Sequence, residues 1–308
     1  MPTCARFVRL LRREESLLMS NEMNTTNKSE ILKFNSLPKD EIRQISLGHR
    51  IWGKTQGFIY PFLTLFMLLV VTETIVRVFH IRNFILPAPT KIFETLFQSW
   101  PYLWTNAKPT LFVVIVGFTM SLCTAVPIGI LIASSKVMEK FVYPLLVTAQ
   151  TIPKIALAPM LIIWFGFSMT PKLVITVLIS FFPMVINTVA GLKGVPQEML
   201  DLARSSRASK LTTFRKIRWP FALPSVFAGL KIAITMAVIG AIVGEYIGAD
   251  KGLGFVLIAA AGRLEMDLVF AAVVILVAIG MSSFYTLTFI ERISIPWHES
   301  IRKENRGH

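Results

Sequence analysis

The chain has 308 residues, of which 54% are hydrophobic and only 16% are charged. Soluble domains usually carry about 25% charged residues, so this composition argues against an ordinary soluble enzyme and favours a membrane protein. The formal net charge of +14 would suggest a nucleic-acid partner for a soluble protein. In a membrane protein the same excess arises when basic residues gather in the cytoplasmic loops.

Six apolar runs are long enough to cross a bilayer, since one crossing needs about 20 apolar residues. They cover residues 58–81, 110–135, 141–168, 173–192, 226–249 and 268–290. Three of these runs contain no charged residue, which is rare for buried helices of soluble proteins. The first run begins only at Phe58, so we expect no amino-terminal signal peptide. The sequence therefore predicts an all-α, polytopic membrane protein with six spans.

Lysine and arginine alternate between the segments that join the spans. The amino-terminal tail (1–57), loops 136–140 and 193–225 and the residues after the last span (291–308) together hold 23 of them, whereas the other three loops hold 6. This bias predicts that both termini are cytoplasmic, as an even number of spans requires. We expect a partly disordered tail over 1–57, a permease-like transmembrane domain over 58–293 and a carboxyl tail over 294–308. Because topology explains the charge, no nucleic-acid partner is expected.

Residues 48–55 match the phosphate-loop pattern G-x-x-x-x-G-K-[ST]. A functional phosphate loop follows a β-strand and opens a helix within an α/β domain. Here mostly polar residues precede the match, and an apolar span begins three residues after it. We therefore interpret these residues as a basic segment at the membrane interface.

The long basic loop before the fifth span has the pattern of two short amphipathic helices within residues 196–220. Pro196 suits a first helical position, Ser209 suits a helix cap, and Pro220 is expected to end the second helix. Apolar residues recur at three-residue spacing and give each helix one apolar stripe, formed by Leu200, Ala203, Leu211, Phe214 and Ile217. Such a stripe needs a partner, which is either the membrane surface or another protein.

This loop resembles the motif E-A-A-x3-G-x9-I-x-L-P, found in permease subunits of binding-protein-dependent ATP-binding-cassette importers. Six residues stand at its defined positions: Asp201, Leu202, Ala203, Arg207, Ile217 and Pro220. Leu202, Arg207 and Trp219 depart from the alanine, glycine and leucine of the motif. The loss of glycine matters because glycine is the residue best suited to a turn with positive φ.

Further elements between residues 85 and 298 resemble the nitrate, sulfonate and taurine branch of that family. They are Leu86-Pro87-Ala88-Pro89, residues 152–159 with the following Trp164-Phe165-Gly166, and Gly252-Leu253-Gly254. The Ile295-Pro296-Trp297-His298 stretch is similar to relatives that handle pyrimidine vitamin precursors or riboflavin.

This resemblance implies the fold of a type I importer permease and a multi-pass location in the inner membrane. It also implies a permease dimer bound to cytoplasmic ATPases, which bind ATP and magnesium, while the chain itself binds no cofactor. The six motif residues would form the ATPase-coupling surface. An external binding protein would deliver a small solute, which is either a nitrate-, sulfonate- or taurine-like anion or a vitamin precursor.

Two charged residues inside the spans are candidates for the solute pathway. Lys154 lies within the third span, where a charge costs at least ~3 kcal/mol, and the neighbouring Pro153 frees backbone groups. Lys154 either lines the pathway and attracts an anion, or pairs with a carboxylate or carbonyl for packing. Glu245, near the outer end of the fifth span, is either a pathway residue or part of a structural ion pair.

Other charged residues in the spans have structural interpretations. Glu73 and Arg77 are four residues apart and can pair on one helix face, and Lys231 is expected to extend towards the inner interface. Residues of the predicted spans include only two acids, Glu73 and Glu245. An ion-coupled secondary transporter, the main alternative function, would need such acids as coupling sites.

Glycines recur at every fourth position near the end of the fifth span, at Gly240, Gly244, Gly248 and Gly252. On a helix they would form a ridge of small residues for close helix packing. No cluster of histidine, cysteine or carboxylate residues has catalytic or metal-binding spacing. The sequence therefore predicts a transport subunit that contains neither a catalytic residue nor a metal site.

Overall fold

The computed structural model describes residue 60 and residues 63–248 and 250–296. Of these, residues 66–248 and 250–296 belong to one compact unit. The predicted tail over 1–57, its phosphate-loop match at 48–55 and the carboxyl tail from Trp297 onwards lie outside the described residues. The boundaries proposed for those tails stay predictions.

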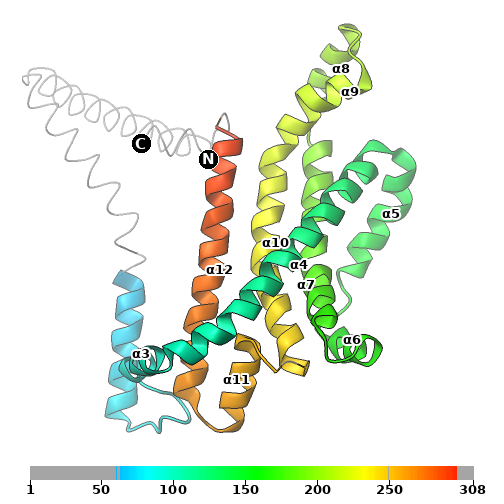
Figure 1. Cartoon of the computed structure of the whole chain (residues 1–308). Coiled ribbons are helices and arrows are strands. Elements are labelled where there is room, and N and C mark those ends of the chain that lie inside the picture. Colours follow the sequence, from blue (N-terminus) through cyan, green and yellow to red (C-terminus); the bar gives the residue numbers. More distant parts are fainter. Residues whose placement is uncertain (1–59, 61–62, 249, 297–308) are drawn as a thin grey trace, which may run out of the picture. The chain divides into compact units, whose positions relative to one another are not determined.

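All regular secondary structure in the described residues is helical (Figure 1). A helix over residues 63–78 comes first. It is followed by α3 (Pro89–Gln98), α4 (Trp100–Ser134), α5 (Lys136–Ala149), η1 (Lys154–Leu157), α6 (Ala158–Phe165), α7 (Met169–Lys193), α8 (Gln197–Ser205), α9 (Lys210–Thr213), the π-helical η2 (Phe214–Arg218), α10 (Trp219–Gly248), α11 (Leu253–Gly262) and α12 (Met266–Ser294). Figure 1 shows α8 and α9 at one end of the helix bundle and α3, α6 and α11 at the opposite end.

Four helices are long and apolar enough to cross a membrane: α4, α7, α12 and the helix over 210–248 that includes α10. The pair formed by α5 and η1–α6 qualifies as a fifth span that is bent by 80°. These five correspond to the second to sixth predicted spans. The predicted span 58–81 is described only in part, as the helix over 63–78. The total of six spans and the cytoplasmic position of both termini therefore stay predictions.

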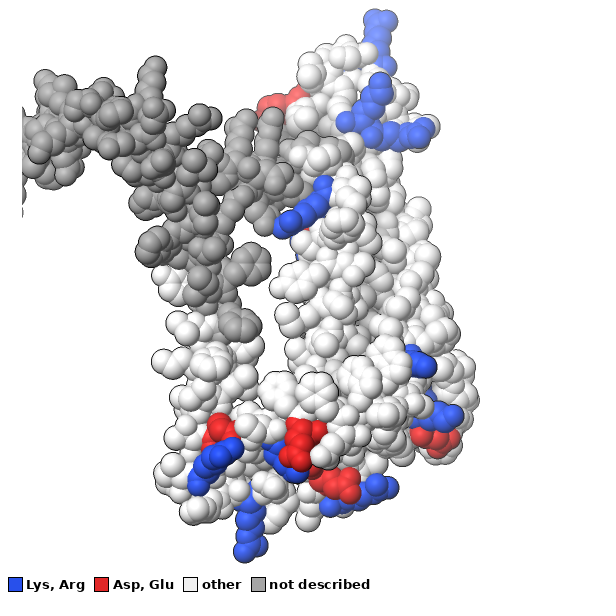
Figure 2. All heavy atoms as spheres, turned by 60° about the vertical axis from the view of Figure 1, so that its left-hand side comes forward, with Lys and Arg blue, Asp and Glu red and all other residues white. Residues whose placement is uncertain are grey.

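Charged side chains lie at the two ends of the bundle and leave a broad uncharged band between them on the face in Figure 2. This distribution matches a chain whose middle faces lipid, because a charge in the bilayer core is costly. The end that carries α8, α9 and η2 is rich in basic residues, as expected for the cytoplasmic side.

The predicted loop over 82–109 is largely helical, which the hydropathy pattern did not indicate. Helix α3 occupies its middle, and α4 begins at Trp100, ten residues before the predicted span. Pro101 lies in the first turn of α4, where its missing N–H breaks no helical hydrogen bond. Helix α3 packs Ile92 and Leu96 against the core, and Thr95 donates a hydrogen bond of 2.8 Å to Asp267 at the start of α12.

Helices α4, α7 and α10 contribute most of the buried core, and α7 and α10 pack closely along their lengths. Gly117 and Gly129 of α4 lie directly against Thr176 and Thr188 of α7, where a Cβ atom would collide with the threonine side chains. Close backbone approach of this kind is typical of helix pairs in membranes. Lipid offers no hydrophobic driving force between helices, so they associate by close packing, which small residues allow.

Candidate coupling surface and membrane pathway

The coupling segment, which we define as residues 197–218, comprises α8, a turn over 206–208, α9 and η2. The predicted first helix is confirmed as α8, and its stripe residues Leu200 and Ala203 are buried. Ser209 caps α9 as predicted, since its hydroxyl accepts the Thr212 N–H at 3.2 Å.

The second predicted helix differs from expectation because Pro220 does not end it. The helix that begins at Lys210 continues through η2 into α10, and Pro220 is the second residue of α10. The π-helical turn of η2 shifts the backbone pairing just before the proline. The missing proline N–H is tolerated there because it falls at a change of hydrogen-bond pattern. The coupling segment is therefore continuous with a membrane helix.

Arg207 adopts a positive φ of 52° at the position that the motif gives to glycine. Two backbone bonds close the end of α8 around it: Ala208 N–H to the Ala203 carbonyl at 3.0 Å, and Arg207 N–H to the Arg204 carbonyl at 2.9 Å. This pair of bonds is the Schellman ending of a helix, whose penultimate position favours glycine. The turn thus keeps the geometry of the motif with an arginine in place of glycine.

The outer face of the coupling segment carries one charge pair and exposed apolar side chains. Asp201 accepts a hydrogen bond of 2.7 Å from Arg204, and both side chains are well exposed. Leu202 is 68% exposed, and Met199 on the same helix α8 is 43% exposed. Exposed apolar side chains on a helix that carries a charge pair form a surface suited to a partner protein.

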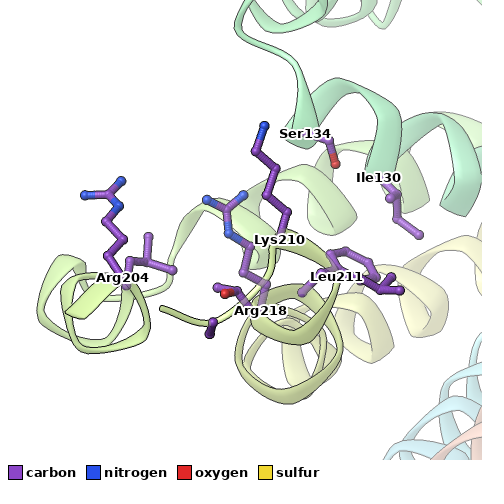
Figure 3. Close-up of a pocket in the computed structure, with 10 residues that line it drawn as sticks. Ile130, Ser134, Arg204, Lys210, Leu211 and Arg218 are labelled. Carbon is purple, nitrogen blue, oxygen red and sulfur yellow. The ribbon is translucent and has the colours of Figure 1, made fainter. Parts of the chain in front are cut away.

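A pocket lies between the coupling segment and the end of α4 (Figure 3). Its apolar walls include Ile130 of α4 and Leu211 of α9, while Lys210 and Arg218 place cationic groups beside them. The sequence pattern does not indicate this pocket, because no spacing rule shows that the end of α4 meets the coupling segment.

Lys154 lies at the break in the third predicted span, one residue after Pro153 caps η1. Its Nζ donates a hydrogen bond of 3.0 Å to the Gln150 carbonyl at the carboxyl end of α5, and it lies 4.6 Å from the ring centre of Phe182. A helix carboxyl end and an aromatic face both attract a cation. The ammonium group therefore has a carbonyl partner and no carboxylate within hydrogen-bonding distance in the described residues.

Glu245 belongs to a buried polar cluster, which we call the glutamate cluster: Asn106, Thr110, Glu245, Gly252 and Gly254. The Glu245 side chain is 2% exposed, and its carboxylate accepts bonds from the Thr110 hydroxyl and the Gly254 N–H, both at 2.8 Å. Asn106 in turn accepts the Gly252 N–H at 3.1 Å. Among the described residues, Lys154 and Glu245 share no hydrogen-bond partner.

Three of the four spaced glycines face α7 and the α6–α7 connection. A Cβ atom at Gly240 or Gly244 would lie within 2.8 Å of the α7 backbone, and one at Gly248 would meet Phe167. Gly252 does not continue this ridge, because α10 ends at Gly248. Gly252 instead caps α11 with a φ of 127° and adjoins the Glu245 carboxyl. Glycine is required there for the positive φ and for the space beside the carboxyl, and not for helix packing.

Two ion pairs link helices on the side of the coupling segment. Lys231 of α10 pairs with Glu291 of α12, where sequence analysis expected Lys231 to extend to the interface, and Lys193 of α7 pairs with Glu139 of α5. Sequence patterns could not indicate these pairs, because their partners lie 54 or more residues apart.

The predicted pair of Glu73 and Arg77 is confirmed, with Nε to Oε1 at 2.6 Å. The same carboxylate accepts the Thr90 N–H at 3.1 Å and the Thr90 hydroxyl at 2.9 Å. Thr90 lies in the first turn of α3, so Glu73 satisfies an amide at a helix amino terminus.

The described fold resembles that of a known importer permease. It superposes on a chain from the inward-facing MetNI methionine ABC transporter with a TM-score of 0.54 at 18% identity, over 64% of this chain and 97% of the other. The bundle of apolar helices with an exposed helical loop at one end is thus the fold of a type I importer permease.

Sequence comparisons place the chain in a family. Residues 125–293 match the family described as "Binding-protein-dependent transport system inner membrane component". The chain is 36% identical to the formylaminopyrimidine transport permease protein ThiX of Halalkalibacterium halodurans, over 78% of this chain and 96% of that protein. It is 27% identical to the putative aliphatic sulfonates transport permease protein SsuC of Bacillus subtilis, over 86% of this chain and 96% of that protein.

The chain belongs to the family of binding-protein-dependent inner-membrane transport components, and within it to the sulfonate and taurine type of branch. It is therefore a multi-pass inner-membrane permease subunit of an ABC importer for small solutes. The subunit is not an enzyme, since ATP hydrolysis in such transporters resides in a separate chain.

Proposed function

We propose that this permease moves a vitamin precursor of the pyrimidine type into the cytoplasm after delivery by an external binding protein. Its 36% identity to the ThiX permease, against 27% to the SsuC permease, supports this choice. The Ile295-Pro296-Trp297-His298 stretch, similar to relatives of the same kind, also supports it. A nitrate-, sulfonate- or taurine-like anion is the second candidate, because its permeases share the branch.

Competition for uptake tests the solute. Cells that express the complete transporter would take up a labelled formylaminopyrimidine, and excess unlabelled pyrimidine would compete whereas taurine would not. Competition by taurine alone would favour the second candidate.

A second experiment tests the energy source. Uptake should stop when ATP is depleted but survive an uncoupler, and the reverse pattern would instead indicate an ion-coupled secondary transporter.

The coupling segment would transmit the force of the ATPase. Asp201, Leu202, Ala203, Arg207, Ile217 and Pro220 would form or shape the surface that docks on a cytoplasmic ATPase carrying ATP and magnesium. The observation that carries this proposal is the exposed pair of Asp201 and Leu202 on a helix closed by the Arg207 turn. Because η2 continues into α10, a displacement of this surface would reach the membrane helix directly and switch the permease between outward-open and inward-open states.

Co-purification with the ATPase tests the coupling surface. Asp201→Lys reverses a charge on the exposed face of α8 and should abolish recruitment of the ATPase. Glu265→Lys is the matched control, because it makes the same charge change on an exposed residue beside α12 at the opposite end of the bundle. Equal recruitment by both variants would remove Asp201 from the interface.

We also propose that two copies of this chain surround the pathway and that Lys154, with Pro153 at the helix break, contributes to it. Lys154 keeps part of its side chain accessible, whereas the carboxylate of Glu245 is enclosed by the glutamate cluster. Geometry therefore supports Lys154 over Glu245 as a pathway residue. Lys154→Met should raise the KM of uptake. Lys91→Met, at a half-exposed lysine of α3, should leave it unchanged, and equal kinetics for both would exclude the role.

A further inference from the structure

The pocket between the coupling segment and α4 combines two cations with an apolar lining. We call it the basic pocket. Figure 3 shows the side chains of Lys210 and Arg218 extending in the same direction, with Ile130 and Leu211 beside them. Leu200 and Phe214 add further apolar surface. The pocket therefore offers a cationic part and an apolar part to one ligand.

The cations of this pocket differ in whether their charge is already paired. Arg204 donates to Asp201 at 2.7 Å, so its charge is largely compensated. Lys210 and Arg218 have no acidic partner among the residues that the structure describes, and no aspartate or glutamate lines the pocket there. Two uncompensated cations side by side attract an anion and disfavour another cation.

The pocket lies where the membrane surface is expected. Ile130 and Ser134 belong to the last turns of α4, a helix apolar enough to span the bilayer. Lys210 and Arg218 begin and end the basic α9–η2 stretch that follows on the charged end of the bundle. A ligand held here would have its charged part at the level of the headgroups and its apolar part against the hydrocarbon edge.

We propose that the basic pocket binds the headgroup of an anionic phospholipid. The phosphate would lie between Lys210 and Arg218, with the Ser134 hydroxyl within the same pocket, and the glycerol and acyl carbons would run along Ile130 and Phe214. Basic pockets beside membrane helices on the cytoplasmic side suit anionic headgroups. A bound lipid would tie the α9–η2 stretch to α4. The pocket adjoins the proposed ATPase surface through Arg204, which pairs with Asp201, but lipid binding can be measured without the solute or the ATPase.

Lipid retention measures this site directly. The full-length chain is reconstituted in nanodiscs of phosphatidylcholine with a minor fraction of phosphatidylglycerol, and the phosphatidylglycerol that stays bound is quantified by native mass spectrometry. Loss of one charge should weaken retention about fivefold, and loss of both about 25-fold, as expected for ~1 kcal/mol per basic residue. The variants are Lys210→Gln, Arg218→Gln and the double variant.

Two control double variants are needed. One tests whether any loss of surface charge weakens lipid retention, and the other tests whether substitution at the site itself causes misfolding. Lys136→Gln with Lys140→Gln removes two lysines from the start of the neighbouring helix α5 and should leave retention unchanged. Lys210→Arg with Arg218→Lys preserves both charges and should retain the lipid. Equal losses in the double variant and the α5 pair would overturn the proposal, and so would retention of inorganic phosphate as tight as that of phosphatidylglycerol.

Discussion

Thr110 of α4 and Glu245 of α10 are joined by a buried hydrogen bond, in which the Thr110 hydroxyl lies 2.8 Å from the carboxylate. Thr110 also accepts the Leu253 N–H at 2.8 Å, and Glu245 accepts the Gly254 N–H at the same distance. The pair therefore fastens α4, the end of α10 and the start of α11 to one another. A buried polar network with satisfied partners makes such a junction rigid.

Removing the carboxylate should destabilise this junction. Glu245→Ala leaves the Gly254 N–H without its acceptor and the Thr110 hydroxyl without its main one, so we expect a loss of about 3 kcal/mol in the free energy of unfolding. Glu245→Gln keeps an acceptor of similar shape and should lose less. The measurement is unfolding in mixed detergent micelles followed by tryptophan fluorescence.

A surface carboxylate provides the control for that measurement. Glu94 pairs with Lys91 at 3.0 Å on the exposed face of α3, and such pairs contribute roughly 0–1 kcal/mol. Glu94→Ala should therefore change stability little. Similar losses for Glu94→Ala and Glu245→Ala would show that the buried cluster has no special role.

A side chain at Gly252 should also disrupt the junction. The residue has a φ of 127°, and a Cβ atom there would overlap the Glu245 carboxyl. We expect Gly252→Ala to lower the free energy of unfolding by about 2 kcal/mol or more, because strain and collision add. Gly262→Ala is the control, since a Cβ at Gly262 meets nothing within 4 Å and the residue closes α11. If Gly252→Ala left the free energy of unfolding unchanged, that result would contradict the described turn.

The positive φ of Arg207 predicts which residues this turn accepts. Arg207→Gly should preserve both stability and recruitment of the ATPase, because glycine adopts this conformation without strain. Arg207→Val should lower stability by about 1–2 kcal/mol, since a β-branched residue rarely adopts positive φ. Co-purification and unfolding are both measured. A result in which Gly and Val variants lose recruitment equally would indicate that the arginine charge matters more than the backbone.

The pair of Lys231 and Glu291 predicts a measurable coupling between α10 and α12. The two side chains are only 23% and 17% exposed, so Lys231→Met leaves a poorly solvated carboxylate and should cost about 2 kcal/mol. Adding Glu291→Met should recover most of that loss. The same double-mutant cycle on the exposed pair Lys91 and Glu94 should show a coupling below about 1 kcal/mol. If the stability losses of Lys231→Met and Glu291→Met simply added in the double variant, the two side chains would not interact.

Local patterns predicted much of the membrane architecture. Apolar run length located five described spans to within a few residues for most ends, because a bilayer requires a minimum apolar length. The cap at Ser209 and the amphipathic helix α8 were also predicted, since both depend on residues within one or two turns. The motif spacing identified Arg207 as the residue at the glycine position, and the structure then showed that the arginine itself adopts the positive φ.

Other features depended on contacts between distant segments. The sequence alone determined an all-helical membrane chain with a basic helical loop, because hydropathy and charge act over short windows. Only the tertiary structure decided that α9 continues through η2 into α10, that Gly252 serves Glu245 rather than the glycine ridge, and that the end of α4 completes the basic pocket. The pocket depends on which helices lie side by side, and residues such as Ser134 and Leu200, 66 positions apart, leave no periodic signal of that proximity.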